Sequence, residues 1–283
     1  MEPIKTLLDR QPAAPAASLP PSLCELYGGD LRFPTTARPY VMANFAATLD
    51  GVVSYKIPGK SGGGEITGQN SDDHFIMGLL RASADAVLVG AGTFNEVGPS
   101  HLWTAEDVWP RGRDLFRRYR TGRTEHPLNV IVTGSGRLDV SRAVFHTPKV
   151  KTLVITTPEG KERIDHACNR AACCVPTRAV GGDARIKAAT VIDILRREFG
   201  VRLLLHEGGP TLFGQFVKEH LVDELFLTIA PQIAGRDSMT DRLALVRDVA
   251  FSPEGAPWLK VLSIKCSGDH VFLRYRRAAE SES

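Results

Sequence analysis

The sequence has no long uninterrupted run of apolar residues. No segment of its 283 residues approaches the roughly 18 consecutive apolar residues that a membrane span needs. Prolines interrupt the first 39 residues, which also lack the continuous apolar stretch of a signal peptide. We therefore expect a protein that is neither embedded in a membrane nor secreted.

Cysteine is scarce, and neither sign of charge is in clear excess. The five cysteines are odd in number and lack metal-ligand spacing, which favours reduced, buried thiols over a disulfide framework. They are Cys24, Cys168, Cys173, Cys174 and Cys266. Lys and Arg number 35 against 32 Asp and Glu, a balance too even to indicate a nucleic-acid or membrane surface. The sequence therefore predicts a cytoplasmic protein that acts on small molecules.

Several catalytic signatures are also missing. There is no G-x-x-x-x-G-K-[ST] loop, no G-x-S-x-G elbow and no H-E-x-x-H pair. The zinc-deaminase combination of H-x-E with P-C-x-x-C is missing too. We therefore expect no metal and no covalent nucleophile.

Short β-branched apolar runs begin at residue 40 and predict an α/β domain over residues 40–283. Residues 1–39, rich in Pro and Ala, are expected to form an arm that wraps the domain or lies loose. The predicted strands are Tyr40–Ala46, Ala86–Val89, Asn129–Thr133, Thr152–Thr156, Arg202–His206, Glu224–Ala230, Leu259–Lys265 and Val271–Tyr275. Several are apolar on both faces, which predicts a mostly parallel sheet with helices on both sides.

Turn and capping residues complete this pattern. Residues 267–269 separate the last two strands and predict an antiparallel hairpin, so the sheet is expected to be mixed. Helices are expected after an N-cap at Ser71, over Val191–Phe199 with Gly200 at its end, and from Pro210 onward.

Glycine is slightly in excess, with 26 residues where about 20 are expected, and part of the excess lies after predicted strands. Segments 90–93, 133–137 and 206–212 each follow a strand. Glycine allows close backbone approach to a ligand, and a helix start attracts anions. The residues that these turns offer to a nucleotide cofactor are Gly90, Gly92, Thr93, Thr133, Ser135, Gly208, Gly209, Pro210, Thr211 and Leu212. Tight turns without a ligand are the alternative interpretation.

The turn at 133–137 bears on the choice of cofactor. The hydroxyls of Thr133 and Ser135, with the guanidinium of Arg137, suit a 2′-phosphate. Such a site would select NADPH over NADH.

Three other segments carry candidates or alternatives. Asp50-Gly51 has ordinary turn chemistry, and the glycine loop at 60–65, with Ser61 as a candidate substrate contact, has the composition of a lid. Segment 98–127 contains six arginines and is interpreted as a solvated excursion, with phosphate binding as the alternative. A nucleic-acid module has little support because no stacking motif accompanies the arginines.

These segments, in this order, resemble a known enzyme family. They comprise Ala-Thr-Leu-Asp-Gly at 47–51, Leu-Arg-Ala at 80–82, the strand and glycine turn at 85–93, Glu-Gly-Gly-Pro at 207–210, Val-Asp-Glu-Leu at 222–225 and Ala-Pro at 230–231. Residues 39–276 resemble the C-terminal reductase domain of the bifunctional riboflavin-biosynthesis deaminase/reductase, within the dihydrofolate-reductase-like superfamily. Because the deaminase signature is missing, only the reductase half is expected.

The resemblance implies a dihydrofolate-reductase-like fold, a homodimer and NADPH as cofactor. The implied reaction is hydride transfer to a pyrimidine that bears a ribosylamino phosphate, such as 5-amino-6-(5-phosphoribosylamino)uracil. Its ribose ring opens to a ribityl chain. Ala46, Thr93 and the Gly208–Thr211 turn are implied to hold the cofactor.

On the substrate side, the resemblance implies that Arg81 meets the phosphate and that Glu207 meets the pyrimidine or ribose. Asp50 is implied to orient the site, and Asp50 or Glu207 is a candidate proton donor. The family usually has an acidic residue four positions after the Thr of its glycine turn, where this sequence has Val97 with Glu96 beside it. This departure motivates one alternative, a nucleotide-binding protein without turnover. A reductase of a related pterin- or dihydrofolate-like substrate is the other.

Overall fold

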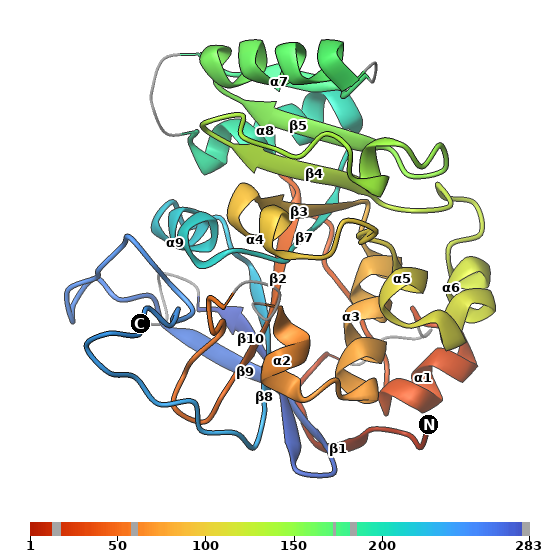
Figure 1. Ribbon diagram of the computed structural model, residues 1–283. Helices are drawn as coiled ribbons and strands as arrows, with labels where there is room; N and C mark the ends of the chain where they lie inside the picture. The colour runs from red at the N-terminus through yellow and green to blue at the C-terminus, as the bar shows by residue number, and fades with distance from the viewer. Residues whose placement is uncertain (13–17, 58–61, 172–173, 182–185, 279–283) are drawn as a thin grey trace.

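A ten-stranded mixed sheet organises the protein (Figure 1). The computed structural model describes residues 1–12, 18–57, 62–171, 174–181 and 186–278. The strands are β1 (Lys5–Asp9), β2 (Tyr40–Ala47), β3 (Ala86–Gly90), β4 (Leu128–Thr133), β5 (Thr152–Thr156), β6 (Thr177–Ala179), β7 (Leu203–His206), β8 (Glu224–Ile229), β9 (Leu259–Ser267) and β10 (His270–Arg277). Their order in the sheet is β1-β9-β10-β8-β2-β7-β3-β4-β5-β6.

The strand directions confirm the expected α/β class and mixed sheet. From β8 to β6, each neighbouring pair of strands runs parallel. β10 pairs antiparallel with both β8 and β9, which confirms the C-terminal hairpin. All eight predicted strands are present, with ends within two residues of those expected. Their β-branched apolar side chains fill a core that lies on both faces of the sheet.

Helices cover both faces of the sheet, as expected. They are α1 (Pro21–Tyr27), α2 (Gly63–Thr67), α3 (Ser71–Ser83), α4 (Ala91–Glu96), α5 (Ala105–Val108), α6 (Arg113–Tyr119), α7 (Pro158–Ala171), α8 (Ala188–Phe199) and α9 (Pro210–Lys218), with 3-10 turns at Pro110–Gly112 and Ala143–Phe145. α1, α3, α6 and α7 pack into one apolar cluster, whereas α8 and α9 pack into a second cluster on the opposite face. None of the helices within the described ranges combines the length and apolarity required to cross a bilayer.

Two segments within the first 39 residues, β1 and α1, contact the rest of the fold. β1 pairs antiparallel with β9 and becomes an edge strand of the sheet. Leu23 and Tyr27 of α1 are buried in the larger apolar cluster. The Nζ of Lys265 on β9 reinforces this contact by donating hydrogen bonds to Thr6 Oγ1 and Gly28 O.

Local capping explains where two helices begin. The N-cap of α3 is Asn70 rather than Ser71, because the Asn70 Oδ1 accepts hydrogen bonds from the N–H groups of Asp72 and Asp73, both at 2.9 Å. α9 begins with Pro210 in its first turn, as the sequence predicts. These two helix starts face the cleft described next.

Candidate active site

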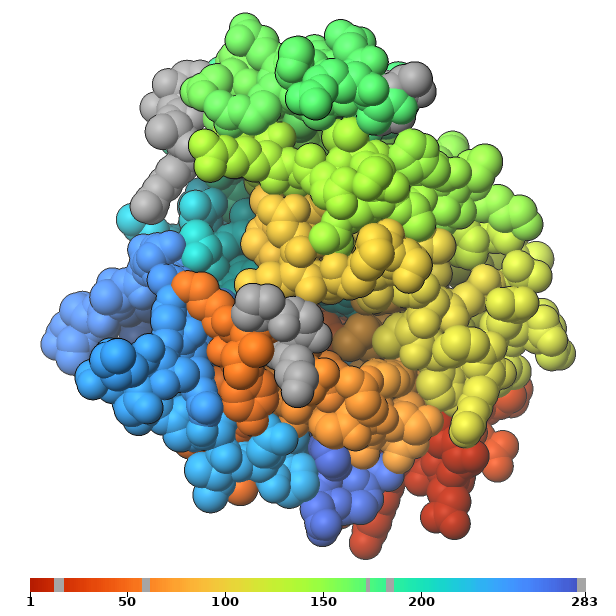
Figure 2. All heavy atoms as spheres, in the orientation of Figure 1, coloured from red at the N-terminus to blue at the C-terminus, as the bar shows by residue number. Residues whose placement is uncertain are grey.

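A cleft of about 910 Å³ opens where the parallel strands end. Its lining includes the carboxyl-terminal ends of β2, β3 and β4 and the segment that follows β7. Ligands of open parallel sheets bind at this edge, and the volume is at the upper end of the usual range for ligand pockets. Figure 2 shows a hollow between the orange segments of α2 and α3 and the yellow segments around α4 and α5.

The structure gathers every residue expected to contact a cofactor in this one cleft. These residues are Ala46, Gly90, Gly92, Thr93, Thr133, Ser135, Gly208, Gly209, Pro210, Thr211 and Leu212. They come from four strand ends that are far apart in the sequence but adjacent in the sheet. Their contacts with a bound cofactor stay a prediction.

The glycine turns after β3 and β7 pack directly against each other. The N–H of Gly90 donates a hydrogen bond of 3.1 Å to the carbonyl oxygen of Gly208. Gly208 has a φ of 134°, a conformation that side chains disfavour, and a Cβ there would lie 2.7 Å from Thr93 Oγ1. The close packing of these two turns therefore requires glycine at position 208.

The residues around these turns fit a dinucleotide. A Cβ at Gly92 would meet no protein atom within 4 Å, so this backbone borders open space in the cleft. The first turn of α9 leaves backbone N–H groups for an anion, because they have no partners within the helix. At the end of β4, Ser135 and Arg137 are exposed, and the Arg137 guanidinium has no ion-pair partner in the described part of the chain.

A buried ion pair joins Arg81 to Glu207 at the floor of the cleft. The Nε of Arg81 lies 3.0 Å from Glu207 Oε1, and its Nη2 lies 2.8 Å from Oε2. Only 3% and 6% of the two side chains are exposed. The other terminal nitrogen of Arg81, Nη1, donates to the carbonyl oxygens of Leu102 and Thr104.

These hydrogen bonds occupy most of the Arg81 guanidinium. A guanidinium has five N–H donors. Glu207, Leu102 and Thr104 take four of the five, which leaves one at Nη2 for any other partner. Arg81 therefore orients the Glu207 carboxylate in this structure, and its contact with the substrate phosphate stays a prediction.

Two other expected site residues are not brought into the cleft. Asp50 is outside the described lining, and its carboxylate accepts hydrogen bonds from Thr48 Oγ1 and from the N–H groups of Ala234 and Gly235. These bonds, led by that from Thr48, lower the pKa of Asp50 to about 2. Asp50 thus joins two loops, as ordinary turn chemistry predicts. Ser61 lies outside the described residues.

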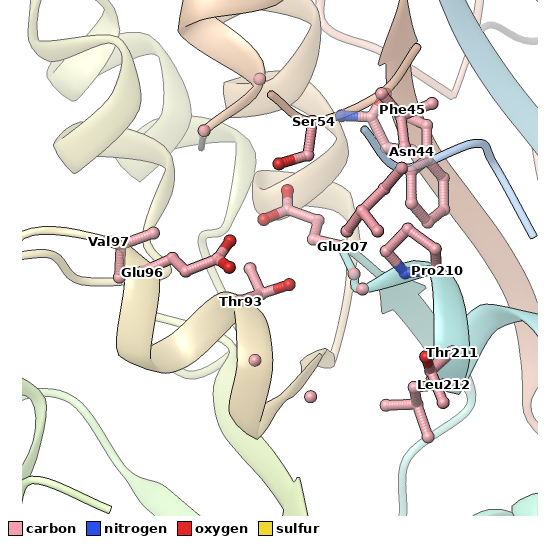
Figure 3. Close-up of a pocket in the computed structure, with 18 of the residues that line it drawn as sticks. Asn44, Phe45, Ser54, Thr93, Glu96, Val97, Glu207, Pro210, Thr211 and Leu212 are labelled. Atoms are coloured by element: carbon pink, nitrogen blue, oxygen red, sulfur yellow. The ribbon is translucent and has the colours of Figure 1, made fainter. Parts of the chain in front are cut away.

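Figure 3 shows where Val97 and Glu96 lie, at the position where this sequence differs from the family pattern. Val97 lies at the border of the cleft and also packs against the apolar core, whereas the Glu96 carboxylate projects into the cleft on the side of Thr93 and Glu207. Burial raises the pKa of Glu96, and the charge of nearby Lys56 opposes this effect. The substrate side of the cleft therefore retains an acidic group one position earlier.

Sequence reasoning missed Asp73, a buried carboxylate in the lining of the cleft. Its Oδ1 accepts a hydrogen bond of 2.7 Å from Thr228 Oγ1, whereas Oδ2 has no hydrogen-bond partner in the described part of the chain. Burial raises the pKa of Asp73, although the Thr228 hydroxyl and nearby His74 and His270 oppose the shift. In the sequence, Asp73 is indistinguishable from an acidic residue that favours a helix start.

His206 lies beneath the turn that carries Glu207. The ring is fully buried and packs edge-on against Phe213 and Phe216, and its Nδ1 accepts a hydrogen bond of 3.2 Å from the N–H of Gly208. Burial lowers the pKa of His206 to about 3. The residue is thus a neutral core group that supports the glycine turn, the more frequent role for a histidine at a strand end.

No group of three or more His, Cys, Asp or Glu side chains is placed to hold a metal ion within the described residues.

Known proteins with similar sequences and folds include named reductases. Residues 39–259 match the sequence model of the family described as RibD C-terminal domain. A protein of Archaeoglobus fulgidus named 2,5-diamino-6-ribosylamino-4(3H)-pyrimidinone 5′-phosphate reductase is 30% identical over 72% of this chain and 85% of its own. A protein of the same name from Methanothermobacter thermautotrophicus is 29% identical, with 72% and 83% covered.

A solved structure shares the fold. The crystal structure of a pyrimidine reductase-like protein from Corynebacterium diphtheriae aligns with a TM-score of 0.68, covering 94% of this chain and 100% of that one at 21% identity.

Proposed function

The chain belongs to the RibD C-terminal domain family, and from this membership we propose that it is an NADPH-dependent reductase of a ribosylaminopyrimidine phosphate in riboflavin biosynthesis. The observation that carries the proposal is the convergence of the glycine turns and the Arg81–Glu207 pair on one cleft. The turns offer backbone contacts to a dinucleotide, and the fixed carboxylate offers a hydrogen-bond acceptor to the substrate.

The proposed reaction assigns distinct tasks to the cofactor and to the chain. The reduced nicotinamide supplies a hydride when it is bound. The substrate carbon C1′ receives the hydride, the bond between C1′ and the ring oxygen breaks, and that oxygen takes up one proton. Glu207 and Glu96 border the cleft and, with Asp73, are the acidic groups that position the substrate. Arg81 holds the Glu207 carboxylate in one orientation.

Asp73 supports a substrate that carries an amino group beside a ring N–H. Its Oδ2, which has no hydrogen-bond partner among the described residues, and its hydrogen-bonded Oδ1 form a buried acceptor group in the cleft. A 2-amino-4-oxopyrimidine offers two adjacent donors to such a carboxylate, whereas the uracil counterpart lacks the 2-amino group. This observation favours the 2,5-diamino substrate named for the relatives, and it equally supports a pterin as the second candidate.

The preference for NADPH rests on the end of β4. Thr133 and Ser135 line the cleft, and Arg137, which has no ion-pair partner among the described residues, follows them. Arg137→Ala is expected to weaken binding of NADPH about tenfold and to leave NADH unaffected, because only NADPH carries the 2′-phosphate. Arg170→Ala, an exposed change at the end of α7, is the matched control. Equal affinities of the unaltered protein for the two cofactors would remove this part of the proposal.

Turnover tests the proposed function and separates it from the alternatives. The purified chain is incubated with NADPH and either the diaminopyrimidinone substrate, the uracil substrate or dihydrofolate. Oxidation of NADPH with a ribosylaminopyrimidine, and formation of its ribityl product, is expected. NADPH binding without turnover on any of the three would instead support a nucleotide-binding protein.

Homodimer formation and a cytoplasmic location remain part of the proposal. Ile233, Met239 and Trp258 are large apolar side chains that are 75%, 93% and 73% exposed, and apolar side chains of this kind are available to a partner chain. Light scattering coupled to gel filtration is expected to give twice the chain mass. A monomer at micromolar concentration would contradict the homodimer.

A further inference from the structure

The loop between α4 and α5 places a histidine with an unusual set of contacts in the cleft wall. His101 lines the cleft, and its Nδ1 lies 3.1 Å from Oδ2 of Asp107. The edge of its ring meets Trp103, with centroids 4.8 Å apart and an interplanar angle of 83°. The two contacts fix the ring plane while 27% of the side chain stays exposed.

The proximity of Asp107 favours one tautomer of His101. A carboxylate oxygen 3.1 Å from Nδ1 would repel a lone pair on that nitrogen, so the neutral ring is favoured with its hydrogen on Nδ1. Burial, and then the charges of Arg81 and Arg142, lower the pKa of His101 to about 3, so the ring is neutral at physiological pH. Nε2 therefore bears a lone pair, and it has no hydrogen-bond partner in the described part of the chain.

The loop that carries His101 is held rigidly. The Asn129 side chain bonds both the N–H and the carbonyl oxygen of Trp103. The Asp107 carboxylate accepts a hydrogen bond from the N–H of Leu102, and the carbonyl oxygen of Leu102 accepts one from Arg81. Because Arg81 also pairs with Glu207, one guanidinium fixes both the loop and the acidic group beside it.

His101 lies at some distance from Asp73, the carboxylate proposed to accept hydrogen bonds from the pyrimidine ring. Asp73 lies in the first turn of α3 and Arg81 in the last, eight residues apart, which corresponds to about 12 Å along the helix. The cleft therefore has room for a sugar between a ring bound at Asp73 and the end where Arg81 and His101 lie. A neutral acceptor nitrogen suits the hydroxyl hydrogen of a sugar and repels the oxygens of a phosphate.

We propose that His101 contacts the substrate, accepting at Nε2 a hydrogen bond from a ribose hydroxyl, while Asp107 positions the ring. This inference rests on the proposed function, since it requires a substrate that contains ribose. His101 would then contribute to the affinity for the substrate through its sugar and would not affect the affinity for the cofactor.

Two substitutions at His101 test the contact. His101→Phe keeps the aromatic ring against Trp103 but removes the acceptor, whereas His101→Gln offers an oxygen in its place. We expect His101→Phe to raise the KM for the ribosylaminopyrimidine phosphate about tenfold, the upper range for one lost hydrogen bond, and His101→Gln to restore most of the loss. The dissociation constant for NADPH should stay the same in both variants. His166→Phe, at an exposed position on α7, is the control.

Substrate analogues identify the hydroxyl. The penalty of His101→Phe should disappear for the analogue, 2′-deoxy or 3′-deoxy, that lacks the bonded hydroxyl, and persist for the other. An unchanged KM in His101→Phe would overturn the proposal, and so would an equal penalty with both analogues.

Nitrogen NMR of the histidine rings provides a readout that does not need turnover. In the unaltered protein Nε2 of His101 should be the unprotonated nitrogen near neutral pH, and Asp107→Ala should populate the other tautomer. The Nε2 resonance should move when the ribosylaminopyrimidine phosphate binds. If this ligand is not reduced but still moves the resonance, the proposed function fails and the contact stands. If it is reduced without moving the resonance, the contact fails and the proposed function stands.

Discussion

Replacing Arg81 with methionine tests whether this arginine orients Glu207 or binds the substrate. Methionine fills much of the same volume but leaves the Glu207 carboxylate buried without its partner. Removing one member of a buried ion pair costs about 3–5 kcal/mol, because the remaining charge is uncompensated. The side chains of Arg81 and Glu207 are only 3% and 6% exposed, so this range applies.

The carbonyl oxygens of Leu102 and Thr104 would lose their charged donor as well. In a chain of 283 residues each kcal/mol corresponds to roughly 2–4 °C of melting temperature, so Arg81→Met should lower Tm by roughly 10 °C. Adding Glu207→Gln should recover part of the loss, because the double variant has no unpaired buried charge.

Differential scanning calorimetry measures these shifts, and Arg197→Met is the control. Arg197 is 77% exposed and pairs with Asp193 one helical turn away, so its loss should cost no more than about 0.5 kcal/mol. A nearly unchanged Tm for Arg81→Met, together with a tenfold higher KM for the substrate, would refute the account. That result would assign Arg81 to the substrate phosphate, as the family resemblance implies.

Three further predictions concern the turns around the cleft. His206 has a pKa of about 3 in the folded protein and about 6.5 in the unfolded chain, so the free energy of unfolding falls as the pH drops below about 6.5. Between about pH 7 and pH 5 this residue accounts for about 2 kcal/mol of that fall, and His206→Phe should abolish this contribution. Urea titrations measure this, and an unchanged pH slope would show that the ring is protonated in the fold. Gly208→Ala should lower Tm, because its Cβ would meet Thr93 Oγ1 at 2.7 Å. Gly92→Ala should leave Tm unchanged and weaken NADPH binding, and calorimetry can measure both effects. A Gly92 variant with full NADPH affinity would contradict the cofactor site. Asp50→Asn should lower Tm, because the carboxylate joins two loops, and should keep kcat/KM within about twofold of the unaltered protein, because Asp50 lies outside the cleft lining. A large loss of kcat at constant Tm would instead show that Asp50 takes part in catalysis.

The strands and the cofactor turns were predictable because their signals are local. Each predicted strand is a β-branched run bounded by turn residues, and each glycine turn directly follows one of these runs. Parallel strands end at a common edge, so the turns converge once the sheet order is fixed. The sequence thereby predicts that these residues lie together without predicting the cleft itself.

Other features depend on contacts that the local sequence does not encode. β1 forms because the edge of β9 is open to pairing with another strand. The sequence does not predict α7, because few of its side chains are buried and few of them are apolar. The partner of Arg81 lies 126 residues away. Asp73 gains its significance only when Thr228 and the cleft are placed beside it. Tertiary structure thus decides which polar side chains face the substrate.

The most direct test of the proposed reductase activity is single-turnover hydride transfer from deuterated NADPH. The reduced cofactor carries deuterium at the transferable position, and 2,5-diamino-6-ribosylamino-4(3H)-pyrimidinone 5′-phosphate is the substrate. The account predicts one equivalent of oxidised cofactor and a ribityl product with deuterium at C1′. Oxidation of NADPH without deuterium at C1′, or tight binding of both ligands without any oxidation, would contradict it.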